Sequence, residues 1–176
     1  LPVEFVGHPL IDAIYNQPNE KTNLFRKENQ LNDKPIIAIL PGSRKQEITK
    51  MLAVMLSVVN DFPDHQFVIA GAPSQEFSFY QKFITQENIK FISNKTYDLL
   101  RNATAALVTS GTATLETALF KVPEVVCYKG SWASYQIAKR IITLKYISLV
   151  KLMMDDEVVI EFILEEGSPK RIREEL

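Results

Sequence analysis

The sequence has little of what marks a disulfide-rich, metal-binding or membrane-spanning protein. Its 176 residues include one cysteine, Cys127, which excludes an internal disulfide and fits a reducing compartment. The two histidines, His8 and His65, lie far apart, and no Cys/His cluster has the spacing of a zinc site. No apolar run approaches the ~18 residues that a transmembrane helix requires. These absences leave a globular protein whose stability comes from its core.

The small net charge and the absence of common nucleotide-binding motifs argue against further classes of protein. The formal net charge is −1, so nothing favours a nucleic-acid partner. No Gly-x-Gly-x-x-Gly follows an expected strand, and no Gly-x-x-x-x-Gly-Lys-Ser/Thr occurs, which weakens dinucleotide and P-loop interpretations. The acidic cluster Asp155-Asp156-Glu157 begins an expected helix, where carboxylates stabilise the helix dipole more often than they bind a metal. We therefore expect neither a metal nor a cofactor.

Short apolar runs alternate with segments of helical spacing from Pro35 onward. Continuous apolar runs are typical of strands buried on both faces of a parallel sheet, and the alternation with helices predicts a three-layer, doubly wound, Rossmann-like α/β fold. The expected strands are 36–40, 67–70, 89–92, 105–108 and 125–128, with a last short strand at 146–149. The expected helices are 47–60, 76–85, 97–102, 115–121, 133–144 and 156–165.

The flanking segments are less regular. A short strand is expected at 1–6, followed by a polar surface linker at 16–34 that contains a short helix at 21–28. The chain starts without methionine inside an apolar stretch, and it stops soon after Ser168-Pro169 begins a new helix. We expect residues 1–176 to be one Rossmann-like domain cut from a longer, two-domain protein.

The most informative stretch is Ser110-Gly111-Thr112, which joins the expected strand 105–108 to a helix. Hydroxyl groups and free backbone N–H groups at a helix N-terminus favour an anion. Glu116 lies about one helical turn further on, where a carboxylate suits a vicinal diol beside a bound phosphate. Residue types alone favour a plain helix cap with a capping-box glutamate.

A second turn of this kind, Gly42-Ser43-Arg44, follows the expected strand 36–40. It offers backbone donors, a hydroxyl and a guanidinium just before a helix, which suits a phosphate or diphosphate. An isolated turn of this composition is usually an exposed arginine. Because ligands of doubly wound sheets bind beyond the carboxyl ends of the strands, both turns can converge on one crevice.

Two other features have simpler readings. Cys127 fits a buried strand residue better than a nucleophile. A basic and aromatic segment is either a solvated helix face or a contact with an anionic lipid surface or lipid-linked substrate. Its residues are Lys129, Trp132, Tyr135, Lys139, Arg140 and Lys145.

Several blocks together resemble the carboxy-terminal half of the lipid-A-disaccharide synthase family. They occur in the family's order over most of residues 5–150. The blocks are Phe5-Val6-Gly7-His8-Pro9-Leu10, Leu40-Pro41-Gly42-Ser43-Arg44 followed by Glu47-Ile48, Ser110 to Glu116, Pro123 to Lys129, and Tyr146 to Leu149.

The resemblance implies a GT-B glycosyltransferase of two Rossmann-like domains, of which the second holds most of the nucleotide-sugar donor. Such an enzyme joins UDP-2,3-diacylglucosamine to the lipid-linked acceptor 2,3-diacylglucosamine 1-phosphate on the way to lipid A, without a metal. It works in the bacterial cytoplasm, peripheral to the inner membrane. The general base belongs to the amino-terminal half, so residues 1–176 alone are expected to contain no catalytic residue and to be inactive.

The same resemblance implies roles for single residues. Gly42, Ser43, Arg44 and the turn Ser110, Gly111 and Thr112 would bind the donor's diphosphate, and Glu116 its ribose. His8 would lie near the crossing between the two domains. Where the family leads us to expect an asparagine and an arginine facing the donor, this sequence has Lys151 and Asp156.

Two other functions stay open at this point. A UDP-N-acetylglucosamine 2-epimerase shares the fold and a similar strand–turn–helix glutamate. A non-catalytic UDP-binding module is the third reading.

Overall fold

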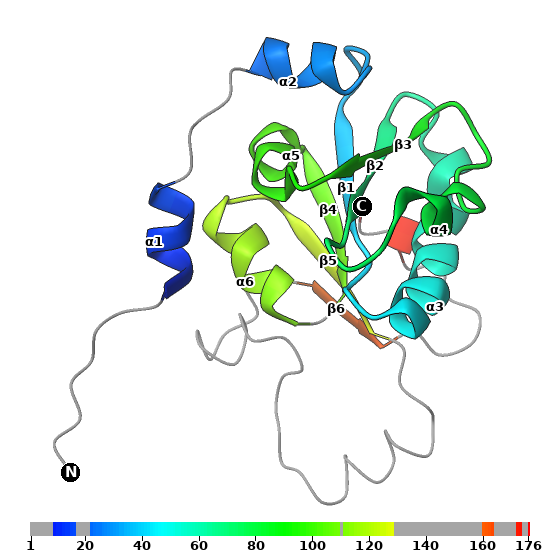
Figure 1. Cartoon of the computed structure of the whole chain (residues 1–176). Helices are drawn as coiled ribbons and strands as arrows, with labels where there is room; N and C mark the ends of the chain where they lie inside the picture. Colours follow the sequence, from blue (N-terminus) through cyan, green and yellow to red (C-terminus); the bar gives the residue numbers. More distant parts are fainter. Residues whose placement is uncertain (1–8, 17–21, 110, 129–159, 164–171, 174–175) are drawn as a thin grey trace, which may run out of the picture.

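The computed structural model describes residues 9–16, 22–109, 111–128, 160–163, 172–173 and 176. These residues form a six-stranded, fully parallel sheet of order β3-β2-β1-β4-β5-β6 (Figure 1). The strands are β1 (Ile36–Leu40), β2 (Gln66–Gly71), β3 (Ile89–Ser93), β4 (Ala105–Thr109), β5 (Glu124–Tyr128) and β6 (Ile160–Ile163). Every residue of β1 and β2 is buried, as the continuous apolar runs require.

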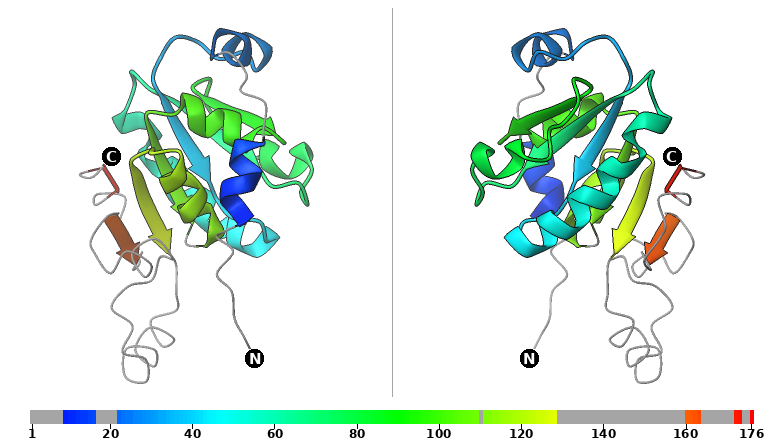
Figure 2. Two further views of the ribbon diagram at one scale, coloured as in Figure 1. Left: turned by 90° about the vertical axis from the view of Figure 1, so that its left-hand side faces the viewer. Right: turned by 90° about the vertical axis from the view of Figure 1, so that its right-hand side faces the viewer.

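Helices cover both faces of the sheet (Figure 2). The bounds are α1 (Pro9–Tyr15), α2 (Thr22–Glu28), α3 (Lys45–Met55), a 3₁₀ helix η1 (Leu56–Asp61), α4 (Phe77–Gln81), α5 (Thr96–Asn102) and α6 (Thr112–Leu119). Alternate residues of β1, β2 and β4 face opposite cores. Ile37 and Ile39 pack in the core formed with α3, η1 and α4, whereas Ala38 and Leu40 pack in the core formed with α2 and α5. The sequence prediction of a three-layer doubly wound fold is therefore confirmed.

Between β1 and β4, the direction in which successive strands are added to the sheet reverses. From β1 the chain winds outward through β2 and β3, then returns to β4 and winds the other way through β5 and β6. Leu40 and Val108 are in register near the ends of these two strands. At such a switch point the connections after the two strands turn to opposite faces and leave a crevice between them. The turns after β1 and β4 therefore flank one crevice.

Two sequence expectations were wrong. The predicted helix 156–165 contains β6, which pairs in parallel with β5 from Val125↔Ile160 to Tyr128↔Ile163. The apolar and β-branched run around Ile160 favours a strand once the edge of β5 is available, and this pairing outweighs the acidic residues that suggested a helix. The segment 16–34 is more than a surface linker, because Phe25 of α2 is fully buried in the core.

Several helices are shorter than expected. The predicted helix 47–60 is α-helical only to Met55 and continues as η1, and the predicted helix 76–85 is reduced to α4. None of the helices in the described part of the chain is both long and apolar enough to cross a membrane. The expectations for the strands 1–6 and 146–149 and the helix 133–144 lie outside the described residues.

Candidate functional site

The carboxyl ends of β1, β2 and β4 surround a cavity of about 390 Å³. This volume suits a small organic ligand. All the sequence-predicted site residues that the structure describes line it, and these are Gly42, Ser43, Arg44, Gly111, Thr112 and Glu116. The structure therefore brings together two turns that are separated by about 70 residues of sequence. Ser110 and His8, and the questioned positions Lys151 and Asp156, lie outside the described residues.

The turn after β1 has the geometry of an anion-binding loop. Gly42 has φ of +95°, which a residue with a side chain rarely adopts. The first N–H groups of α3 have no intrahelical partner, as in every helix. Arg44 is the N-cap residue, and its side chain makes no capping hydrogen bond to them. Glu47 reaches back, and its Oε2 accepts a hydrogen bond from the Ser43 N–H at 3.3 Å. A carboxylate thus already lies beside the N–H groups that suit a phosphate.

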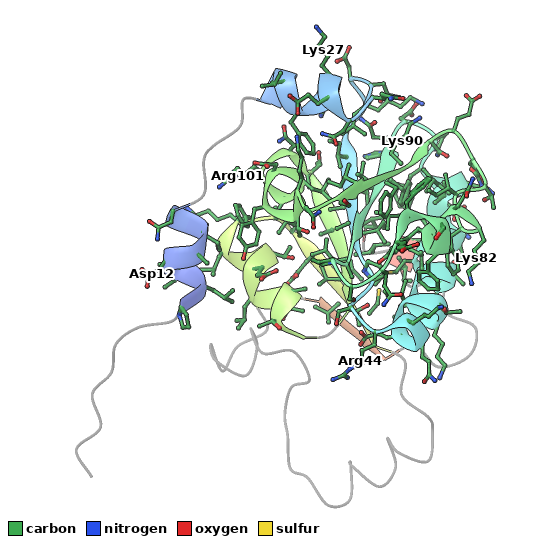
Figure 3. All side chains as sticks on the ribbon, in the orientation of Figure 1. Asp12, Lys27, Arg44, Lys82, Lys90 and Arg101 are labelled. Atoms are coloured by element: carbon green, nitrogen blue, oxygen red, sulfur yellow. The ribbon has the colours of Figure 1, made fainter. Side chains whose placement is uncertain are left out.

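Arg44 provides the positive charge of this turn. Its side chain is exposed and extends beyond the carboxyl edge of the sheet, at the end of the molecule opposite Lys27 and Lys90 (Figure 3). A guanidinium there can form two parallel hydrogen bonds to a phosphate.

The turn after β4 leads into α6 with Gly111 as N-cap and without a side-chain cap. A Cβ built on Gly111 meets no atom within 4 Å, so the turn faces open space. The hydroxyl of the buried Thr114 donates to the Gly111 carbonyl at 2.8 Å, which uses that hydroxyl inside the protein. Thr112 is exposed, so among the described residues of this turn its hydroxyl is the one that can reach a ligand.

Glu116 lies one turn into α6 and is half-buried in the cavity wall. The Tyr97 hydroxyl, from α5, donates to Glu116 Oε1 at 3.2 Å. Burial raises the pKa of Glu116, and the hydrogen bond from Tyr97 lowers it in part. A helix cap alone does not describe Glu116, because its carboxylate accepts a hydrogen bond from α5 and lines the cavity.

Sequence reasoning missed two residues of this site. Glu47 was quoted in the family motif without a role, although a glutamate at the third position of a helix signals a capping interaction. Tyr97 gave no signal, because it lies 19 residues before Glu116 and only the packing of α5 beside α6 brings the two together. Cys127, by contrast, is buried as predicted, and burial raises the pKa of its thiol to about 12, which excludes a thiolate nucleophile near neutral pH.

Comparisons with known structures agree with this architecture. The UDP-GlcNAc 2-epimerase from Methanocaldococcus jannaschii superposes with a TM-score of 0.57 at 14% identity, over 93% of this chain and 44% of that one. The E. coli ADP-heptose LPS heptosyltransferase II superposes with a TM-score of 0.58 at 14% identity, over 88% of this chain and 49% of that one. At such low identity the similarity shows the fold alone, and it is the Rossmann-like fold of these proteins.

The sequence comparisons are more specific. Lipid-A-disaccharide synthase of Coxiella burnetii (strain Dugway 5J108-111) is 36% identical over 181 residues, covering all of this chain and 47% of the relative. The enzyme of Idiomarina loihiensis is also 36% identical, over 187 residues, covering all of this chain and 48% of the relative. The chain thus spans about half the length of the curated relatives it matches. The model of the lipid-A-disaccharide synthetase family matches residues 1–176, and the chain therefore belongs to that family.

Proposed function

We propose that the cavity between the β1 and β4 turns binds the UDP part of a UDP-sugar donor. One observation carries the proposal: two uncapped helix N-termini, Arg44 and a half-buried carboxylate line the same cavity. The N-termini and the guanidinium suit the two phosphates, and Glu116 suits the two hydroxyls of a ribose. Gly42, Ser43 and the turn Ser110, Gly111 and Thr112 provide the backbone donors.

The distribution of charge supports the same ligand. Arg44 and the positive ends of two helix dipoles line one cavity, and together they favour the negative charges of a diphosphate. Glu116 lies on the second turn of α6, where a carboxylate oxygen can accept hydrogen bonds from a diol without lying at the phosphate position. A dinucleotide is less well matched, since the glycine-rich fingerprint is absent.

We further propose that this chain is the donor-binding half of a glycosyltransferase acting in lipid A biosynthesis. The proposal rests on family membership and on the printed names of the relatives. In the reaction, the anomeric carbon of a 2,3-diacylglucosamine exchanges its bond to the UDP oxygen for a bond to a hydroxyl of 2,3-diacylglucosamine 1-phosphate. UDP leaves, and the hydroxyl proton passes to a general base.

The acceptor site and the general base would come from another, amino-terminal Rossmann-like half of the protein. This proposal follows from the relatives, which are about twice as long as the chain. With a lipid-linked acceptor, the protein would work at the cytoplasmic side of the inner membrane as a peripheral protein.

Titration calorimetry with UDP, together with amide chemical shifts, tests the binding proposal. We expect saturable binding with shifts concentrated at Gly42 to Arg44 and Gly111 to Glu116. Shifts confined to other regions would overturn it. Analysis of the products formed by the full-length protein from UDP-2,3-diacylglucosamine tests the reaction, since a lipid disaccharide supports the transferase and an epimerised sugar nucleotide supports the epimerase.

A further inference from the structure

Tyr97 links α5 to the candidate site through one side-chain hydrogen bond. Its hydroxyl donates to Glu116 Oε1 at 3.2 Å, and both side chains are half-buried. The preceding residue, Thr96, lines the cavity itself, so α5 begins at the cavity wall.

The Tyr97 ring makes a second contact, with an aromatic ring at the end of α6. It packs against Phe120, which follows α6, with 5.3 Å between ring centroids and 44° between ring planes. The guanidinium of Arg101 lies 5.3 Å from the centroid of the Phe120 ring and also pairs with Asp98 at 2.8 Å. The contact with Phe120 restrains the Tyr97 ring, and with it the direction of the C–O bond that carries the hydroxyl.

A carboxylate with one oxygen engaged in this way has a defined orientation. Tyr97 donates to Oε1, and within the described part of the chain no hydrogen bond to Oε2 is seen, so Oε2 offers its acceptor capacity to a ligand. A vicinal diol needs two acceptor positions in a fixed geometry. A carboxylate that rotates freely would have to lose that freedom when the ligand binds.

We propose that Tyr97 is a positioning residue, which holds the Glu116 carboxylate in the orientation that accepts hydrogen bonds from the vicinal diol of a nucleoside diphosphate. This inference rests on the proposed function of the cavity. The role is separate from packing, because a phenylalanine retains the ring contact with Phe120 and loses only the hydroxyl. Burial alone favours the protonated form of Glu116, and the bond from Tyr97 counteracts it.

The test compares UDP with 2′-deoxy-UDP on four proteins: the wild type, Tyr97→Phe, Glu116→Gln and the double variant. Tyr97→Phe, which removes the tyrosine hydroxyl, is expected to weaken UDP binding roughly three- to tenfold, the effect of about one hydrogen bond. It is expected to weaken the binding of 2′-deoxy-UDP less. In the Glu116→Gln background, Tyr97→Phe is expected to cause a smaller loss, because the neutral amide oxygen accepts a weaker hydrogen bond from Tyr97 than the carboxylate does. Equal losses for both ligands, or additive losses in the double variant, would overturn the proposal.

Tyr80→Phe is the matched control. The Tyr80 hydroxyl accepts a hydrogen bond from the Ala72 N–H at 2.9 Å, and its ring packs against Phe91. Losing this hydroxyl should leave the ratio of the two affinities unchanged. If the wild type bound no UDP, the proposed function itself would fail. If UDP bound and Tyr97→Phe left the ratio unchanged, only the inference about Tyr97 would fail.

Discussion

The carboxylate of Glu47 accepts a hydrogen bond from the backbone N–H of Ser43, with 3.3 Å between Oε2 and N. The bond spans four residues and brings a negative charge to the N-terminus of α3. A Cβ placed on Gly42 would lie 2.2 Å from the same oxygen, which shows how closely the carboxylate approaches the turn. A diphosphate bound at this turn would have to share these donors with Glu47 or displace it.

Replacing Glu47 with glutamine is therefore expected to tighten UDP binding. At about 5 Å and an effective dielectric of about 20, two like charges repel by about 3 kcal/mol before screening. With screening, we expect roughly three- to tenfold higher affinity, decreasing as salt is added. Calorimetry at two salt concentrations measures this.

Glu76→Gln is the control for this prediction. Glu76 is exposed at the N-cap of α4 and does not line the cavity, so the same change of net charge should have little effect. Weaker binding by Glu47→Gln would mean that the carboxylate supports the turn instead of competing with the ligand.

Arg44→Gln is expected to weaken UDP binding about tenfold or more. A hydrogen bond to a charged group contributes roughly 1.5–3 kcal/mol, and the guanidinium is the cation of the β1 turn. Lys27→Gln removes the same charge at the opposite end of the molecule (Figure 3) and should leave the affinity nearly unchanged. Similar losses in the two variants would indicate a general effect of net charge.

The preference for UDP over 2′-deoxy-UDP should depend on pH through Glu116. Burial raises the pKa of this carboxyl above its ordinary value of 4.5, so protonation begins at a higher pH than for an exposed glutamate. The ionised form accepts hydrogen bonds at both oxygens, whereas protonation converts one of them into a donor and removes the charge that strengthens these bonds. The ratio of the two affinities is therefore expected to fall as the pH falls through this raised pKa.

Both nucleotides carry the same phosphates, so the effect of phosphate titration on binding cancels in the ratio of their affinities. Among the described residues, the other titratable or charged side chains around the carboxylate are Tyr97 on α5 and, lining the same cavity, Arg44 and Glu47. Glu116→Gln should abolish the pH dependence of the ratio. If the dependence persists in that variant, another group is responsible for it.

Glu124→Gln is expected to stabilise the protein at pH 8. Burial raises the pKa of the Glu124 carboxyl to about 8, and the nearby Thr117 hydroxyl lowers it only in part, because that hydroxyl donates to the Ala113 carbonyl. The folded state therefore holds a proton that the unfolded state releases above pH 4.5, so the free energy of unfolding falls as the pH rises from 4.5 to 8. The difference of pKa corresponds to at most roughly 4–5 kcal/mol.

Urea unfolding of the wild type and Glu124→Gln at pH 5 and pH 8 checks this prediction. The stability advantage of the variant should be large at pH 8 and small at pH 5. Glu87→Gln, at an exposed position, is the control and should show no such difference. An equal advantage at both pH values would point to a packing effect.

The sequence by itself determined the fold class and pointed to the two turns that line the cavity. Four continuous apolar runs and the run 89–92, which Lys90 interrupts, each precede a helical pattern and correspond to β1 to β5 within one or two residues. These features are local: a buried parallel strand requires apolar residues, and Gly42 has a φ of +95° that glycine adopts readily. The strands and the turns could therefore be predicted without knowing which distant residues they contact.

Only the tertiary structure decided which residues meet. It paired Ile160 to Ile163 with β5, because backbone pairing with an available strand edge outweighs a local helix preference of less than about 1 kcal/mol per residue. It also placed Tyr97 against Glu116, since nothing in either segment specifies the distance between α5 and α6. Contacts of this kind depend on how whole helices pack on the sheet, and packing is set by the shapes of many side chains together.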